Sequence, residues 1–237
     1  MTWFPACDFG LDVAGRAYQS SDLLLGSVPV IPFEVLTVFF AAAVALGLAP
    51  GPDNIFVLTQ SALYGRLAGL VVTLGLCTGL IVHTVAVALG VAAIFQTSAL
   101  AFTVLKFVGA GYLLYLAFQA FRAGKTDLGG QTAPALSGAA LFRRGIVMNV
   151  TNPKVAIFFL AFLPQFADPA RGSVPLQVVL FGGLFIVATI LVFSGIALGG
   201  GVLGAFLRRS SQAQIWLNRI AGLVFVGLAV RLAIAER

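Results

Sequence analysis

The sequence predicts an all-α, polytopic membrane protein, and two observations carry that prediction. Hydrophobic residues make up 60% of the chain and charged residues only 9%, with a mean hydropathy of +1.05. A soluble domain has about 25% charged residues, so this chain has too few of them to cover a water-facing surface. Apolar blocks also alternate with short polar breaks, and the length leaves room for about six spans of roughly 20 residues each.

The predicted spans follow one another from Pro32 onward. We expect them over residues 33–49 with a broken continuation over 52–64, then 67–95, 100–121, 145–166, 174–207 and 215–234. Residues 1–31 form a polar leader, either poorly ordered or upstream of the true translation start. The predicted organisation is therefore a leader, a three-helix unit over 32–122, a linker over 123–144 and a second three-helix unit over 145–237.

A proline-rich break interrupts the first span. Pro50, Gly51 and Pro52 follow an unbroken apolar run, and Asp53 comes next. Each proline removes a backbone donor and clashes one turn back, so an ordinary helix cannot continue. In a bilayer such a break persists only where protein or a water-filled cavity satisfies the freed groups. A carboxylate at that depth is costly, which makes Asp53 a candidate site residue; the alternative is a structural cap or ion pair.

A second break, Asn152-Pro153-Lys154, lies at the matching position of the second unit. Because each unit has an odd number of spans, the second copy is inverted, and interrupted segments at matching positions of two inverted repeats point to a transporter's central site. We expect Gly51 and Asn152 to cap two half-helices that begin with proline. Lys154 then opposes its own helix dipole, which suggests function; the alternative is that it snorkels to the interface.

Several motifs, in this order, resemble those of the LysE/RhtB family. They are Ala49-Pro50-Gly51-Pro52-Asp53, then Gly79 and His83, then Leu105-Lys106-Phe107-Val108-Gly109-Ala110, and finally Asn149-Val150-Thr151-Asn152-Pro153-Lys154 followed by residues 158–166. The resemblance covers nearly everything from Phe33 to the end; the leader departs from it. It implies a bacterial inner-membrane exporter of amino acids and related metabolites, driven by the proton gradient.

The two breaks together suggest a site for a zwitterion. We predict that Asp53 and Lys154 either pair or each hold one end of the solute, with its ammonium facing Asp53. Its carboxylate would lie on half-helix N–H groups near Lys154. Neutral hydrogen bonds would come from Asn54, Asn149, Thr151 and Asn152. Asp53 and His83 are the candidates for proton coupling, because imidazole titrates near neutral pH; His83 alternatively bonds a backbone carbonyl.

Charge and composition bound the partners. Lys and Arg gather on the side of the central linker, which predicts a cytoplasmic linker and periplasmic termini. The net charge of +6 falls in loops and does not indicate nucleic acid. We expect a small-molecule substrate, the lipid bilayer, a possible homodimer through glycine-rich spans, and no cofactor or bound metal.

Two other function classes stay open at this point. A metal-cation exporter would need several carboxylates at the midplane, where Asp53 stands alone. An intramembrane enzyme is less favoured, because the chain lacks a His-Glu-x-x-His motif, a Gly-x-Ser-x-Gly motif and a second histidine.

Overall fold

The computed structural model describes residues 31–97, 99–124, 135–200 and 210–234, and within these ranges the chain is helical. The α-helices are α2 (Phe33–Leu48), α3 (Pro52–Tyr64), α4 (Arg66–Thr97), α5 (Ala99–Arg122), α6 (Gly138–Val150), α7 (Pro153–Ile157), α8 (Val174–Leu198) and α10 (Ser211–Ile234). After α7 come a π-helical segment, Phe158–Phe162, and two 3₁₀ turns, Leu163–Phe166 and Pro169–Arg171.

Both predicted breaks are sharp bends. The axes of α2 and α3 meet at 63°, and α6 meets the segment Pro153–Phe166 at 49°. The α3 helix begins with Pro52 after Gly51, and α7 begins with Pro153 after Asn152, as predicted for two half-helices. Proline suits a first helical position, because its missing N–H would have had no partner there.

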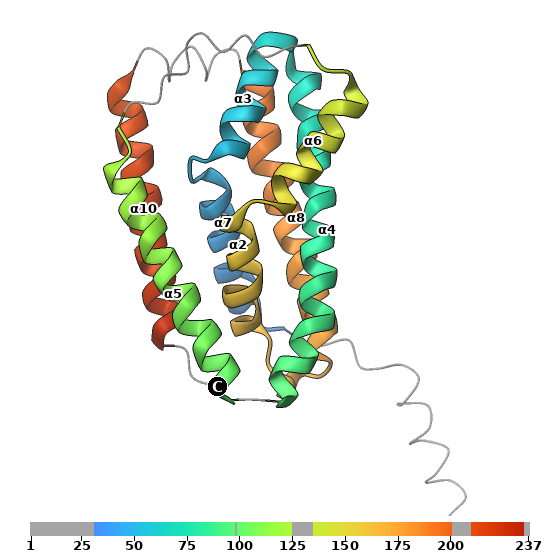
Figure 1. Ribbon diagram of the computed structural model, residues 1–237, viewed down its shortest axis with the longest axis vertical. Helices are drawn as coiled ribbons and strands as arrows, with labels where there is room; N and C mark the ends of the chain where they lie inside the picture. Colours follow the sequence, from blue (N-terminus) through green and yellow to red (C-terminus); the bar gives the residue numbers. More distant parts are fainter. Residues whose placement is uncertain (1–30, 98, 125–134, 201–209, 235–237) are drawn as a thin grey trace, which may run out of the picture.

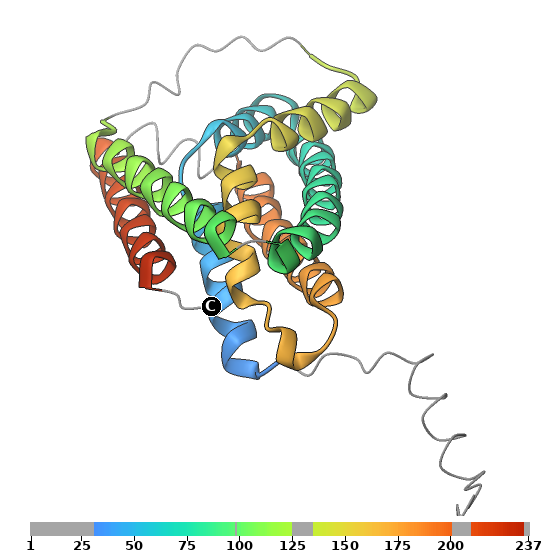
Figure 2. The same ribbon diagram turned by 60° about the horizontal axis from the view of Figure 1, so that its bottom comes forward.

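The helices form two groups around a central pair. In Figures 1 and 2, α5 and α10 lie side by side on one flank, α4 and α8 lie on the other, and α2 and α7 run between them. The end where α3 joins α4 is also the end where α5 finishes and α6 begins (Figure 1). We call it the linker end, because residues 123–137 connect α5 to α6 there.

Two element boundaries differ from the prediction. The α6 helix begins at Gly138, seven residues before the predicted start, because Ser137 caps it by accepting a hydrogen bond from the Ala140 amide at 3.3 Å. The α8 helix ends at Leu198, just before the glycine run, and residues 201–207 of the predicted span lie outside the described residues. The leader and the centre of the linker lie outside the described residues.

Within the described part, α4, α8 and α10 are long and apolar enough to cross a membrane, and each bent pair adds one further span. That gives up to five spans, and α5 is not among them. The structure therefore supports a polytopic membrane protein, while the count of six and the inverted repeat stay predictions.

Two buried apolar clusters fill the interior. The aromatic cluster consists of Phe39, Phe158, Phe159, Phe162, Phe166, Phe181 and Phe185, whose neighbouring ring centroids lie 4.8–6.5 Å apart. The smaller cluster, nearer the linker end, consists of Val57, Val72, Leu76, Leu141, Phe193 and Ala197. Offset and edge-on rings at such distances attract one another beyond simple burial, so the aromatic cluster is the stronger packing unit.

Candidate functional site

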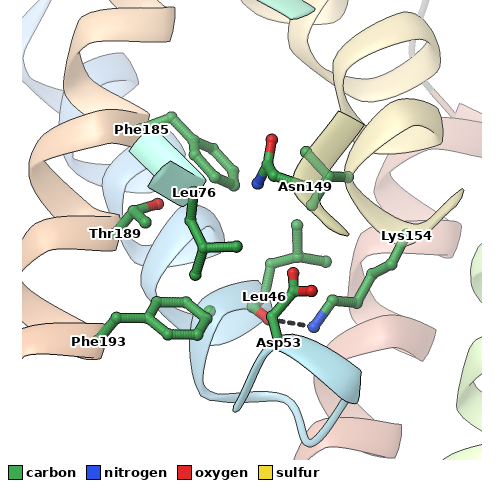
Figure 3. A pocket seen from close by; sticks show the side chains of 10 residues that line it. Leu46, Asp53, Leu76, Asn149, Lys154, Phe185, Thr189 and Phe193 are labelled. Atoms are coloured by element: carbon green, nitrogen blue, oxygen red, sulfur yellow. Dashed lines mark hydrogen bonds between the residues drawn. The ribbon is translucent and has the colours of Figure 1, made fainter. Parts of the chain in front are cut away.

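A small cavity lies where the two apolar clusters meet, beside both helix breaks. Its polar lining comes from Asp53 on α3, Asn149 on α6, Lys154 on α7 and Thr189 on α8. Its apolar lining is Leu46, Gly47, Leu76, Val155, Phe185 and Phe193. Figure 3 shows the carboxylate of Asp53 and the ammonium of Lys154 on one side and the α8 residues opposite. The cavity volume of about 20 Å³ has room for about one water molecule, so this conformation leaves no space for an amino acid at the site.

Asp53 joins the two breaks through a hydrogen bond. Asn152 Nδ2 donates to Asp53 Oδ2 at 2.6 Å, while Asn152 Oδ1 accepts from the Lys154 amide at 3.0 Å. One amide side chain thus caps α7 and holds the carboxylate at the start of α3. The carboxylate also lies at the positive end of the α3 dipole, which stabilises a negative charge.

Lys154 satisfies backbone carbonyls that the first break sets free. Its ammonium donates to Leu46 O at 3.1 Å and to Ala49 O at 3.0 Å. The helical partner of Leu46 O would be the amide of residue 50, which is proline and has no N–H. Lys154 therefore lies at the carboxyl end of α2, where the dipole favours a cation. That offsets its unfavourable position at the amino end of α7.

No salt bridge joins Asp53 to Lys154 in this conformation. Among the described residues the ion pair that forms is Arg171 with Asp168, at 3.3 Å on an exposed turn. Asp53 and Lys154 still attract each other electrostatically across the cavity edge. Of the two predicted arrangements, the direct pair is not the one adopted here.

The remaining site candidates are Asn54, Thr151 and the prolines of the two breaks. Asn54 Nδ2 donates to Gly47 O at 2.7 Å, which satisfies another carbonyl of the first break. Thr151 is exposed, and its hydroxyl donates to Val147 O at 2.7 Å, so the structure does not bring it to the cavity. Pro50 and Pro52 are exposed and contribute through the bend they impose, and Pro153 acts in the same way at the second break.

His83, on α4, contacts the second break outside the cavity. Its Nε2 lies 3.2 Å from Asn149 O, and its ring packs on Phe159 with centroids 5.5 Å apart. The helical partner of Asn149 O would be the amide of residue 153, again a proline. Asn149 O still accepts from the Asn152 amide at 3.0 Å, so the imidazole N–H is its second donor. His83 is not among the residues that line the cavity.

Three buried acceptor oxygens beside the breaks have no hydrogen-bond partner within the described residues. They are Asp53 Oδ1, Asn54 Oδ1 and Asn149 Oδ1. Buried polar atoms are nearly always paired, and two of these residues line the cavity. The site therefore presents unused acceptors, which call for a ligand that donates hydrogen bonds.

Sequence reasoning did not find the α8 wall of the cavity. Phe185, Thr189 and Phe193 are spaced four residues apart, so they occupy one face of α8. A threonine flanked at this spacing by two aromatic residues within an apolar span was the available signal.

The comparisons agree with the geometry. Residues 44–236 match the family model described as LysE type translocator, which covers well over half of the chain. The chain belongs to the LysE family of translocators. This LysE-type chain is therefore a membrane transporter, and its family is one of efflux proteins rather than of enzymes.

Curated relatives of this LysE-type chain include named exporters. An uncharacterized membrane protein of Vibrio cholerae is 35% identical over 86% of this chain and 98% of its own length. The homoserine/homoserine lactone efflux protein of Salmonella typhimurium is 34% identical over 86% and 98%. The leucine efflux protein of Salmonella choleraesuis is 28% identical over 82% and 92%. No solved structure matches the chain significantly.

Proposed function

We propose that this transporter exports amino acids or related small zwitterions across the bacterial inner membrane, in exchange for protons. The observation that carries the proposal is the pair of unused acceptors, Asp53 Oδ1 and Asn149 Oδ1, on two residues lining one cavity. An ammonium group has three donors and a positive charge, so it matches a carboxylate beside an amide oxygen. Export of amino acids is also what the names of the curated relatives describe.

The relatives' substrates support the ammonium as the recognised group. Homoserine, its lactone and leucine all carry an α-amino group, whereas the lactone has no free carboxylate. An exporter of these three compounds needs a fixed hydrogen-bond acceptor for the ammonium group. Its partner for the carboxylate must also tolerate a solute without one. In this chain Asp53 suits the first role. Lys154 suits the carboxylate role, because its ammonium can release a backbone carbonyl of α2 and donate to a solute carboxylate instead.

The helix ends refine where that carboxylate would bind. The N–H of Lys154 is occupied by the side chain of Asn152, whereas no side chain caps the amino end of α3. The ammonium of Lys154 is also close to α3, because a Cβ placed on Gly51 would lie 3.3 Å from Nζ. The solute carboxylate therefore fits the amino end of α3 better than the amino end of α7. The sequence alone had suggested N–H groups near Lys154, at the start of α7.

Proton exchange is assigned to Asp53. A carboxylate that binds the solute ammonium in one half of the cycle can take a proton in the other half, so solute and proton compete for one group. His83 is the second candidate, although its N–H is engaged with a backbone carbonyl here.

A counterflow experiment in proteoliposomes tests the proposal. The panel should contain leucine, homoserine, an amino-acid methyl ester, which keeps the amine, and a 2-hydroxy acid, which lacks it, each with and without a pH gradient. Amino acids and the ester should be transported and the hydroxy acid should not, with the pH gradient driving accumulation. Transport of the hydroxy acid alone, or of none of the four, would refute the proposal. Manganese uptake by the same proteoliposomes tests the alternative of a metal-cation exporter, and that alternative predicts manganese transport without amino-acid transport.

A further inference from the structure

Gln60 on α3 is a buried side chain whose polar atoms the described chain leaves unpaired. It is 0% exposed, and neither Oε1 nor Nε2 has a hydrogen-bond partner among the described residues. Gln177 on α8 is equally buried, but it accepts from the Asp168 amide at 3.0 Å and donates to Asp168 O at 2.8 Å and Gly172 O at 3.3 Å. Of these two fully buried glutamines, one is satisfied by the fold and the other is not.

Gln60 is aligned with Asp53 along one face of α3. Seven residues separate them, which is close to two helical turns, or about 10 Å along the axis. Val57 lies between them, is fully buried and belongs to the smaller apolar cluster. Gln60 therefore lies past Val57 from the cavity, towards the linker end.

The neighbouring residue shows how closely this part of α3 is packed. A Cβ placed on Gly69 of α4 would overlap the Ser61 hydroxyl, and a Cβ on Gly200 would lie 2.5 Å from Ser61 Cβ. Tight contact with small residues explains why Ser61 is small. Tight packing does not explain the carboxamide of Gln60, the residue before Ser61. An apolar residue of equal length would fill the same volume there without losing hydrogen bonds.

We propose that Gln60 is a second solute-contacting residue, on the path between the cavity and the linker end. When the smaller cluster separates, its amide meets the solute: Oε1 accepts from the solute ammonium, and Nε2 donates to the carboxylate or to accompanying water. A carboxamide suits a passing zwitterion, because it offers a donor and an acceptor without a charge that would hold the solute. The inference rests on the proposed amino-acid export.

Two matched variants test it, Gln60→Met and Gln177→Met, since methionine has nearly the length and shape of glutamine. Each is measured by thermal unfolding in detergent and by leucine transport in inside-out and right-side-out vesicles. Gln60→Met should raise the melting temperature by a few degrees, because it removes unpaired buried groups. It should also raise KM at least tenfold for leucine offered from the linker side, and less from the opposite side. Gln177→Met should melt lower and retain KM on both sides.

Every outcome decides the matter. A wild-type KM for Gln60→Met would overturn the inference, and so would a lower melting temperature, because that would show that the fold itself satisfies the amide. Equal KM increases from both sides would also contradict a position on the linker side of the cavity. If the wild-type protein transports no amino acid, the proposed function fails, and the inference fails with it. If wild-type transport is normal, only the role of Gln60 is in question.

Discussion

The Lys154 ammonium lies 3.1 Å from the carbonyl oxygen of Leu46, although the two residues belong to different predicted repeats. Leu46 O has lost its helical donor to Pro50, and the second break supplies a replacement. In the opposite direction, Asn149 O cannot accept from residue 153, which is proline, and it accepts instead from the Asn152 amide at 3.0 Å and from His83 of the first unit at 3.2 Å. Each break is thus completed by a side chain from the other unit, which is how a membrane protein can maintain two interrupted helices side by side.

This relationship predicts that Lys154→Met loses stability as well as export. Two buried carbonyls would be left without their donor, at a cost of about 1–3 kcal/mol each. Adding Pro50→Ala to Lys154→Met returns an N–H to the chain opposite Leu46 O, so part of the stability should return while export stays lost. Thermal unfolding and leucine export measure the two effects separately. Wild-type export by Lys154→Met would contradict a role for the ammonium in solute binding.

Asp53→Asn should abolish export with little change in stability. The side chain keeps its shape, and its oxygen can still accept from Asn152 Nδ2, but the group facing the cavity becomes a donor that opposes an ammonium. A fall in transport of at least a hundredfold is expected, from about 3 kcal/mol of lost charge-assisted hydrogen bonding. Asp168→Asn, on the exposed turn, is the matched control and should transport normally. Equal losses in the two variants would argue against a specific role of Asp53.

Much of the site was predictable because the rules that set it are local. A proline lacks an N–H in any context, so the sequence alone located both breaks, and the preference of Asn for helix starts predicted the Asn152 cap. The partner of Lys154 was not predictable, because it depends on how α7 packs against α2. Local dipole reasoning treated the residue as misplaced, whereas its ammonium is at the favourable end of another helix.

The fold was predictable to a similar depth. Hydropathy located the helical segments, since burial in lipid requires long apolar stretches. It could not locate the start of α6, because that helix begins in a polar segment where Ser137 provides the cap. The π-helical turn after α7 was also unforeseen. Such turns arise from packing of the whole region and are frequent at functional sites.

Close packing of α4 against α6 predicts a strong effect of a small substitution. A Cβ on Gly75 would overlap Phe142 O and lie 3.0 Å from Gly145 Cα, both on α6. Gly75→Ala must therefore separate the two backbones, at a cost of about 1–3 kcal/mol. Gly90→Ala, on the same helix, meets nothing within 4 Å and should stabilise the helix by about 0.5–1 kcal/mol. Thermal unfolding of both variants provides the comparison, and similar melting temperatures would refute it.

His83→Gln separates proton coupling from structural support. If the imidazole only donates a hydrogen bond to the backbone oxygen of Asn149, a glutamine side chain can replace that donor. Leucine accumulation driven by a pH gradient should then persist. His83→Leu offers no donor, and it should lose only about 0.5–1.5 kcal/mol of stability, the net contribution of one hydrogen bond, because Asn149 O keeps its bond from the Asn152 amide. The ratio of leucine transport with and without a pH gradient measures the coupling for each variant. If His83→Gln transports leucine by counterflow but no longer responds to the gradient, the coupling proton belongs to His83 rather than to Asp53.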